Sequence, residues 1–498
     1  MKKDPALALH TYANPLSLPD IPFGTDDWCK NEHGMSDAYG KPEDNTAPDY
    51  RSISDPTVFF WEDRWYLYPS YGMAWVSEDF EHWRHVRTKP YHPKYSPAIT
   101  PWKDGKFLLT AWYCPLYVAD SPLGDFTEIG DFELPDGKMF RPCDPALFRD
   151  DDGRLYLYEV KLRKNPAASE GFSVNIVGYE LDQNTPTRVV RGPIDIVLMN
   201  PENKPWERHG VHNQDTSFGW VEGPHLLKYR GCYYMIYAAP DTSDASYCMA
   251  VYRSEESPLD GFACQKRNPL TAHRTGIVTG AGHGSVERGP GDTLWAFYTI
   301  AAPWAHPYER RIGMDLVAVD EEGELYCPFG VTDTPQYVPG FRKDPLREGN
   351  SPGLFNLTAA KRPTVSSCAA GRDAVYATDE NNLSFWLPEE NDPAPTITCS
   401  LSGRFTVSAL RLFFRELGMD VRAGILPQPI GYLLEGACGD TWFPLADRRQ
   451  NREERNVDYI TFPAQICDKV RLTLTGKNPH TRVGLIDFAV FGKRTEDE

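Results

Sequence analysis

A repeated pattern of an acidic residue, a strand, a tight turn and a second strand constrains the fold of this chain most. Asp55 precedes TVFFWEDRWYLY, Asp144 precedes ALFRDDDGRLYLY, and Glu222 precedes a segment that ends in HLLKYRGCYYMIY. Each segment holds two apolar, tyrosine-rich runs around a two-residue turn: Glu62-Asp63, Asp152-Gly153 or Arg230-Gly231. This order is typical of a β-hairpin. We therefore expect three hairpins with an acid at the same place ahead of the first strand.

The hairpin pattern recurs along the chain, which indicates a repeat architecture. Five segments begin at intervals of roughly 40 to 80 residues, at Trp61, Trp102, Leu147, Leu227 and Val286. Two of them also share nearly the same phrase, VADSPLGDF and RSEESPLDGF. Multi-stranded repeats of this period predict a propeller, which closes radially around a central channel. A sandwich with similar hairpins by coincidence is the alternative. In a propeller the first strand of each blade lines the axis, so the three acids would face one another.

The sequence changes character after about residue 340, where PGFRKDPLREGNSPG is rich in Pro, Gly and charge and carries no blade pattern. Short strand patterns such as SALRLFF, DKVRLTLTG and VGLIDFAVFG follow it, and they are typical of an antiparallel β-sandwich. We predict an all-β chain in three parts. These are a five-bladed β-propeller over residues 1–340, a linker over 341–354 and an accessory β-sandwich over 355–498.

Charge and composition limit the partners of this chain. Its 52 Lys and Arg against 70 Asp and Glu give a net charge of −18, which disfavours nucleic acids and anionic membranes. The N-terminal segment is interrupted by Asp4, Pro5 and His10 before it forms a signal-peptide core. Apolar runs stay below the roughly 20 residues that cross a bilayer. The 11 cysteines are scattered, so we expect reduced thiols, a cytoplasmic location and a neutral partner such as a sugar.

Three converging carboxylates fit the hydrolysis of a glycosidic bond. That reaction needs a protonated carboxyl that donates to the leaving oxygen and an ionised carboxylate that activates water or attacks directly. A third carboxylate raises the pKa of the acid by like-charge repulsion. The alternative for an Asp before Pro is a turn former.

The segments CDPALFRDDDGRLYLY, VEGPHLLKYRGCYYMIY and GAGHGSVERGPGD resemble the family 43 glycoside hydrolases, and the match covers roughly residues 50–320. The resemblance implies a five-bladed propeller that hydrolyses with inversion and requires no cofactor. It makes Asp55 the general base, Asp144 the pKa modulator and Glu222 the general acid. An inverting pair implies that Asp55 and Glu222 lie roughly 6.5–9.5 Å apart.

Further residues are candidates for binding the sugar. The resemblance matches His283 to a histidine on the axis beneath the sugar, where it would hold water or a structural calcium ion. It matches Arg311 to an arginine near the substrate. Four aromatic rings are candidates for stacking on a sugar face, and blade core is the alternative for each: Trp75, Trp112, Tyr113 and Phe218.

The expected function is an inverting, exo-acting glycoside hydrolase that removes a terminal α-L-arabinofuranosyl or β-D-xylosyl unit from plant-type oligosaccharides. The alternatives are a galactosidase or galactofuranosidase on the same scaffold, a phosphorylase, and a non-catalytic propeller that binds glycans. The C-terminal part resembles a discoidin-like sandwich of the kind found in carbohydrate-binding modules. We expect it to brace the propeller, because no exposed aromatic platform is evident around Trp386 or Trp442. The sequence leaves the sugar, its linkage and the oligomeric state open.

Overall fold

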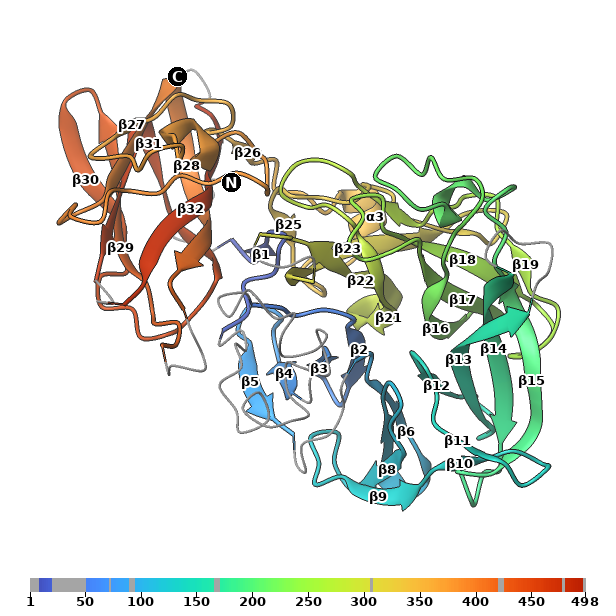
Figure 1. Ribbon diagram of the computed structural model, residues 1–498. Coiled ribbons are helices and arrows are strands. Elements are labelled where there is room, and N and C mark those ends of the chain that lie inside the picture. The colour runs from blue at the N-terminus through green and yellow to red at the C-terminus, as the bar shows by residue number, and fades with distance from the viewer. Residues whose placement is uncertain are drawn as a thin grey trace.

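The computed structural model describes residues 9–19, 51–70, 73–88, 95–164, 171–304, 308–419, 425–476 and 480–495. These residues form five antiparallel sheets around a common axis and a further antiparallel sheet beside them (Figure 1). The predicted all-β fold with a five-bladed propeller is therefore confirmed. No helix in the described ranges is long and apolar enough to cross a membrane.

Each blade is one sheet whose strands follow the order of the chain from the axis outward. Blade 1 contains β2 (Thr57–Trp61), β3 (Arg64–Tyr68), β4 (Met73–Ser77) and β5 (Arg84–Arg87). Blade 2 contains β6 (Ala98–Pro101), β7 (Phe107–Thr110), β8 (Leu116–Ala119) and β9 (Thr127–Gly130). Blade 3 contains β12 (Ala146–Arg149), β13 (Leu155–Lys164), β14 (Phe172–Leu181) and β15 (Val189–Leu198). Blade 4 contains β16 (Glu222–Tyr229), β17 (Cys232–Ala239), β18 (Cys248–Ser254), β19 (Ala263–Cys264) and β20 (Thr271–Ala272). Blade 5 contains β21 (Gly282–Gly289), β22 (Thr293–Ala301), β23 (Arg310–Val319) and β24 (Leu325–Tyr326).

The first two strands of every blade form the predicted hairpins. Glu62 and Asp63, with φ of 49° and 58°, turn the chain between β2 and β3. Such left-handed pairs match the twist of the strands they join. Neighbouring blades bury a mixed aliphatic and aromatic core between them, as Tyr158 and Ile176 of blade 3 do against Met235 of blade 4.

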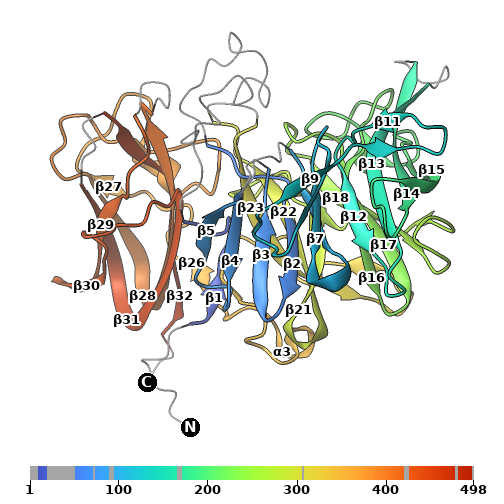
Figure 2. The same ribbon diagram turned by 90° about the horizontal axis from the view of Figure 1, so that it is seen from below.

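The innermost strands hold the ring of blades together. The Thr57 hydroxyl donates to the carbonyl of Pro97 at 2.6 Å, which joins blades 1 and 2. The Val58 amide donates to the Ser285 hydroxyl at 3.0 Å, which joins blades 1 and 5. Figure 2 shows the blades from the side, and hydrogen bonds through Ser70 join Asp55, Ser96 and Asp144, which stand just ahead of β2, β6 and β12. The residues at the starts of these strands therefore meet at one end of the propeller.

The C-terminal part forms one seven-stranded sheet that includes the longest strands of the described chain. They are β26 (Phe355–Asn356), β27 (Thr364–Val365), β28 (Thr396–Leu417), β29 (Gly431–Cys438), β30 (Thr441–Asp447), β31 (Val457–Thr475) and β32 (Arg482–Arg494). Register shifts along β28, at Ser400/Phe405 and Val407/Ala409, bend the strand. The sheet curls around a core that includes Trp386, which is fully buried. The antiparallel β-sandwich of the prediction corresponds to this curled sheet.

Short elements complete the fold. They are β1 (Thr11–Tyr12), β10 (Phe132–Glu133), β11 (Met139–Phe140), β25 (Gln336–Tyr337), α3 (Pro345–Glu348) and the 3-10 turns Lys103–Gly105, Pro205–Glu207, Pro290–Asp292 and Ala374–Ala377. β1 pairs with β25 and so ties the start of the described chain to the end of the propeller. The last blade strand ends at Tyr326 and the C-terminal sheet begins at Phe355. The division at residues 340 and 354 stays a prediction.

Candidate active site

Each blade places one residue with left-handed backbone at the start of its innermost strand. These residues are Asp55, Ser96, Asp144, Gly223 and His283, with φ of 52°, 49°, 45°, 54° and 32°. Proline follows four of them directly in the chain. For residues other than glycine this conformation costs roughly 1–3 kcal/mol, and such strain clusters at functional sites. The common backbone geometry turns one residue of every blade toward the same end of the axis.

A chain of hydroxyls links two of the predicted acids across blades 1 and 2. Ser70 donates to Oδ2 of Asp55 at 2.6 Å, and the Ser96 amide donates to the Ser70 hydroxyl at 3.1 Å. The Ser96 hydroxyl in turn donates to Oδ1 of Asp144 at 2.8 Å. The contribution of blade 2 to the site is therefore a serine rather than an acid.

Blade 4 departs from the predicted equivalence of the three acids. Gly223, not Glu222, occupies the left-handed position that Asp55 and Asp144 occupy in their blades. A Cβ atom on Gly223 would lie 2.5 Å from Cδ2 of His283, so only glycine fits there. The Gly223 amide hydrogen-bonds to the Asp144 carboxylate. Glu222 stands one residue earlier, so the expectation of a shared position holds for the two aspartates alone.

Asp55 is the acid with the strongest cationic surroundings. Only 4% of its surface is exposed, and its Oδ1 lies 3.2 Å from Nη1 of Arg310 and 3.5 Å from Nδ1 of His283. Burial by itself raises the pKa of Asp55, but Arg310, His283 and the hydroxyls of Ser70 and Ser54 outweigh it, so that the pKa lies below its usual value. Asp55 is therefore held ionised.

Glu222 has the opposite electrostatic environment. The indole N–H of Trp220 donates to its Oε2 at 2.9 Å, and the Tyr247 hydroxyl donates to its Oε1 at 2.5 Å. Burial and then the negative charge of Asp144 raise the pKa of Glu222 well above its usual value, although the Tyr247 hydrogen bond opposes them. Glu222 is therefore poised to carry a proton at neutral pH.

Asp144 lies between these two extremes. Burial raises its pKa, His283 lowers it, and the nearby charge of Asp55 raises it again, so that the pKa lies above its usual value. Its negative charge acts on Glu222 in turn. The site thus combines a carboxyl whose pKa is lowered, a carboxyl whose pKa is raised and a third acid whose charge adds to that rise. Acid–base hydrolysis requires two carboxyls with pKa values shifted apart in this way.

The structure corrects the prediction for Arg311. This side chain is 1% exposed and points away from the axis into the contact with the C-terminal sheet, where it donates to Oδ1 of Asn456 at 2.5 Å. Adjacent residues of a strand point to opposite faces, and the preceding residue, Arg310, is the one that contacts Asp55. Arg310 therefore takes the place that the sequence assigned to Arg311.

The structure also corrects the prediction for Trp75. The ring is 0% exposed in the core of blade 1, and its indole N–H donates to the carbonyl of Pro19 at 2.8 Å. A sugar has no access to either of its faces. Trp75 is a core residue, which is the alternative considered for every aromatic candidate.

The other aromatic candidates lie closer to the acids or remain accessible. Tyr113 is 53% exposed and packs edge-on against Trp112, with ring centroids 4.8 Å apart. Its amide donates to the carbonyl of Pro142 at 2.7 Å, two residues before Asp144. Trp112 and Tyr113 therefore border the site and stay predicted sugar contacts.

Phe218 lies two residues before Trp220, whose indole N–H donates to Glu222. Its ring stacks on His209 with centroids 5.0 Å apart and an interplanar angle of 9°. One face of the ring is thus already covered. The role of Phe218 in sugar binding stays a prediction.

Sequence reasoning missed five residues of the site: Ser70, Ser96, Trp220, Tyr247 and Arg310. A signal for Ser96 was present, because Ser96-Pro97 lies two residues ahead of a strand as Asp55-Pro56 and Asp144-Pro145 do. Trp220 lies only two residues from Glu222. Tyr247 and Arg310 are brought in by the third strands of blades 4 and 5, and no local pattern marks them.

The calcium ion that the resemblance implies at His283 stays a prediction. Calcium binds six to eight oxygen ligands. Within the described ranges no group of three or more His, Cys, Asp or Glu side chains is arranged to hold a metal ion. The His283 imidazole instead faces the carboxylate of Asp55, and the chemistry proposed below uses no metal.

Comparisons with known proteins find similarity over the propeller. Residues 50–325 match the family described as Glycosyl hydrolases family 43. A xylosidase/arabinosidase of Butyrivibrio fibrisolvens is 32% identical over 177 residues, which cover 34% of this chain and 27% of that protein. The beta-D-galactofuranosidase xynD of Aspergillus niger (strain ATCC MYA-4892 / CBS 513.88 / FGSC A1513) is 26% identical over 214 residues, 42% of this chain and 53% of that protein.

The chain thus spans about a quarter and about half of the length of these two relatives. The crystal structure of a thermostable family-43 glycoside hydrolase is 23% identical, with a TM-score of 0.47 over 60% of this chain and 99% of that one. The matching family region runs from just before blade 1 into the last strand of blade 5 and contains every residue of the acidic cluster. The chain belongs to the glycosyl hydrolases family 43.

Proposed function

We propose that this protein is an inverting, exo-acting glycoside hydrolase that removes a terminal α-L-arabinofuranosyl or β-D-xylosyl unit from plant-type oligosaccharides. Asp55 is the general base, Glu222 the general acid and Asp144 the pKa modulator. The observation that carries the proposal is the opposite direction of two pKa shifts at one site, because the pKa of Asp55 is lowered and that of Glu222 is raised.

The proposed reaction follows from these protonation states. Glu222 donates its proton to the glycosidic oxygen as the bond to the anomeric carbon breaks, and it becomes a carboxylate. Asp55 accepts a proton from the water that attacks the opposite face of that carbon. Arg310 and His283 hold Asp55 ionised before the step. Burial and the negative charge of Asp144 keep Glu222 protonated, because both raise its pKa.

The xylosidase/arabinosidase relative supports a pentose as the sugar. Exposed rings beside the acids supply a surface for it. Tyr113 is 53% exposed, and Tyr308, which is 37% exposed, lies with its ring 5.5 Å from the Arg310 guanidinium. The galactofuranosidase relative makes a terminal galactofuranosyl unit the second candidate.

A panel of aryl glycosides of arabinofuranose, xylose, galactose and galactofuranose tests the proposal. We expect phosphate-independent release of arabinose or xylose, and NMR should show that the first anomer released has inverted configuration. Glu222→Gln should abolish turnover and leave sugar binding intact. Retained configuration would rule out the mechanism, and preference for galactofuranose would select the second candidate. Binding without turnover by the unaltered protein would support a non-catalytic propeller.

A further inference from the structure

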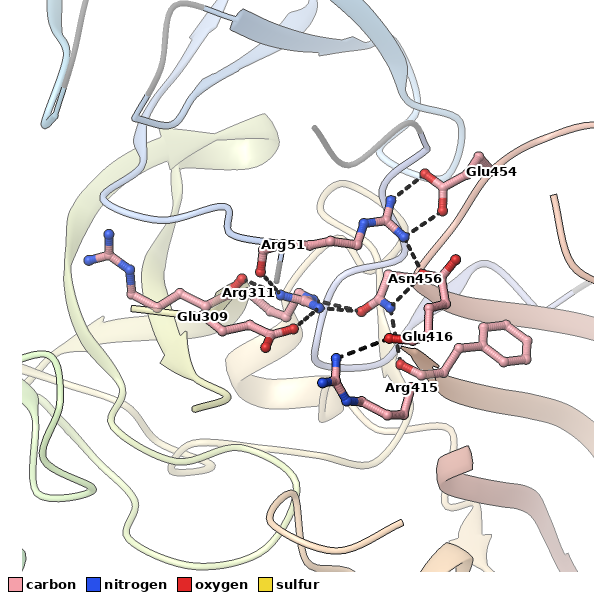
Figure 3. A network of polar contacts seen from close by, with 9 residues as sticks. Arg51, Glu309, Arg311, Arg415, Glu416, Glu454 and Asn456 are labelled. Carbon is pink, nitrogen blue, oxygen red and sulfur yellow. Dashed lines mark hydrogen bonds and ion pairs between the residues drawn. The ribbon is translucent and has the colours of Figure 1, made fainter. Parts of the chain in front are cut away.

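A buried polar network joins the propeller to the C-terminal sheet (Figure 3). Two propeller segments enter it. One is residues 51–55, which lead to Asp55, and the other is residues 309–311, which contain Arg310. The network thus contacts both chain segments that carry the Asp55–Arg310 ion pair.

Arg311 is the centre of this network. Its Nη1 donates to the carbonyl of Arg51 at 2.7 Å and to the carbonyl of Arg310 at 2.8 Å. Its Nε and Nη2 both donate to Oδ1 of Asn456, at 2.8 and 2.5 Å. One guanidinium therefore contacts the backbone of both propeller segments. Asn456, just ahead of β31, and Glu309 of the propeller, whose Oε1 lies 3.2 Å from Nη2, both accept hydrogen bonds from it (Figure 3).

Asn456 is itself held rigidly by the C-terminal sheet. It is 2% exposed, and its Nδ2 donates to the carbonyl of Phe414 in β28 at 3.1 Å. The same nitrogen lies 3.4 Å from Oε2 of Glu416, which accepts a hydrogen bond from Arg51 at 2.5 Å. The orientation of Asn456 is thus set by a long strand outside the propeller.

The path from Asn456 to the base is short. Arg310 precedes Arg311 on the same strand, β23, and it points to the opposite face, where its Nη1 lies 3.2 Å from Oδ1 of Asp55. The Ile53 amide donates to the Arg310 carbonyl at 3.1 Å. That carbonyl also accepts from Arg311. Loss of the bond between Arg311 and Asn456 would loosen the backbone on both sides of the ion pair.

We propose that the C-terminal sheet positions the general base of the propeller, with Asn456 as a positioning residue that acts through Arg311 on Arg310 and Asp55. The inference rests on the proposed function for the role of Asp55. It gives the C-terminal sheet a part in the reaction that requires neither sugar binding nor contact with the substrate.

The test compares Asn456→Ala with the unaltered full chain in two measurements. The first is steady-state kinetics with the best aryl glycoside of the panel, where kcat should fall by about tenfold, because small displacements of a reacting group lower the rate steeply. KM should stay within about twofold, because no substrate contact changes. The second is hydrogen exchange at the Ile53 amide, which should become at least about tenfold faster as its bond to Arg310 opens.

Tyr459→Phe is the matched control. The Tyr459 hydroxyl lies 2.7 Å from Thr11 Oγ1 and so also joins the C-terminal sheet to the N-terminal segment, away from the base. The Tyr459→Phe variant should change neither kcat nor the rate of hydrogen exchange at the Ile53 amide. A fall in kcat of equal size for both variants would show a general loss of docking and would overturn the proposal.

Arg311→Lys provides a second route if Asn456→Ala folds poorly. Lysine keeps the charge but cannot make the five hydrogen bonds of the guanidinium fork, so it should lower kcat and protection at Ile53 in the same way. Because Asn456 and Arg311 act through the same series of contacts, the double variant should lose no more kcat than the worse single variant. Additive losses would overturn the proposal. If the unaltered protein cleaves none of the panel glycosides, the proposed function fails, and Ile53 exchange alone decides the inference.

Discussion

The propeller axis and the contact with the C-terminal sheet are both buried clusters of charge, but their charge balance differs. At the axis three carboxylates, Asp55, Asp144 and Glu222, meet the single guanidinium of Arg310 and the imidazole of His283. In the contact three arginines meet three glutamates: Arg51, Arg311, Arg415, Glu309, Glu416 and Glu454 (Figure 3).

The difference in balance explains the difference in chemistry. At the axis burial and mutual repulsion raise the pKa of Asp144 and Glu222. Among the described residues a guanidinium, that of Arg310, is paired with Asp55, and it lowers the pKa of that acid. In the contact Arg51 is almost fully buried, yet Glu454 and Glu416 raise its pKa above the usual value. A buried cluster with excess charge is typical of a catalytic site. The balanced cluster of arginines and glutamates instead holds the C-terminal sheet against the propeller.

Arg51→Met tests the structural half of this comparison and has the largest expected effect. The substitution removes the partner of Glu416 and Glu454, and a buried ion pair that loses one member costs about 3–5 kcal/mol. Urea unfolding followed by fluorescence should show this loss of stability. Arg191→Met is the control, because the Arg191–Asp260 pair is about half exposed and such pairs contribute less than about 1 kcal/mol. Equal losses for the two variants would contradict the comparison.

Asp144→Asn tests the catalytic half. Loss of its charge lowers the pKa of Glu222, so that less of the acid is protonated, and kcat/KM at neutral pH should fall by about 10²-fold. The free energy of unfolding should rise by about 1 kcal/mol, because catalytic sites retain repulsion that the fold does not need. The introduced amide oxygen can still accept the hydrogen bond from Ser96. A variant that loses both activity and stability would show that Asp144 holds the structure rather than the protonation of Glu222.

The pH profile tests the directions of the two pKa shifts. Activity requires ionised Asp55 and protonated Glu222, so it should fall as pH drops through the lowered pKa of Asp55 and as pH rises through the raised pKa of Glu222. Tyr247 opposes the second shift, so Tyr247→Phe should move the basic limb of kcat/KM to higher pH. A shift of one unit changes the rate on that limb by about tenfold. A limb that moves to lower pH would contradict the assignment of Glu222 as the acid.

The blades and the acids were predictable because short-range patterns specify them. A turn such as Asp152-Gly153 between apolar runs defines a hairpin regardless of the rest of the fold. The Asp-Pro pairs at 55 and 144 mark the start of an innermost strand. Ser96-Pro97 has the same pattern but carries a hydroxyl, so a search restricted to acids passes over it.

The faces of the buried strands were not predictable in the same way. Nearly all of β23 and all of β4 are buried, so the alternation of polar and apolar residues that shows which face is inward is absent. Arg310 and Arg311 are identical side chains on opposite faces of β23, and only their partners, Asp55 and Asn456, distinguish them. Trp75 in β4 was misassigned for the same reason. Long-range contacts decide such positions.

Ser96→Ala has the smallest expected effect and probes the link between the acids. It removes the hydroxyl that donates to Asp144 at 2.8 Å, a bond worth about 1 kcal/mol, so kcat/KM should fall by a few-fold. Ser96→Gly removes the same hydroxyl but also relieves the left-handed backbone at φ 49°, which glycine adopts without strain. Both variants should therefore lose the same activity, while the glycine variant unfolds at higher urea concentration than the alanine variant. If Ser96→Gly had the full activity of the unaltered protein, the loss in Ser96→Ala would come from backbone strain and not from the missing hydroxyl.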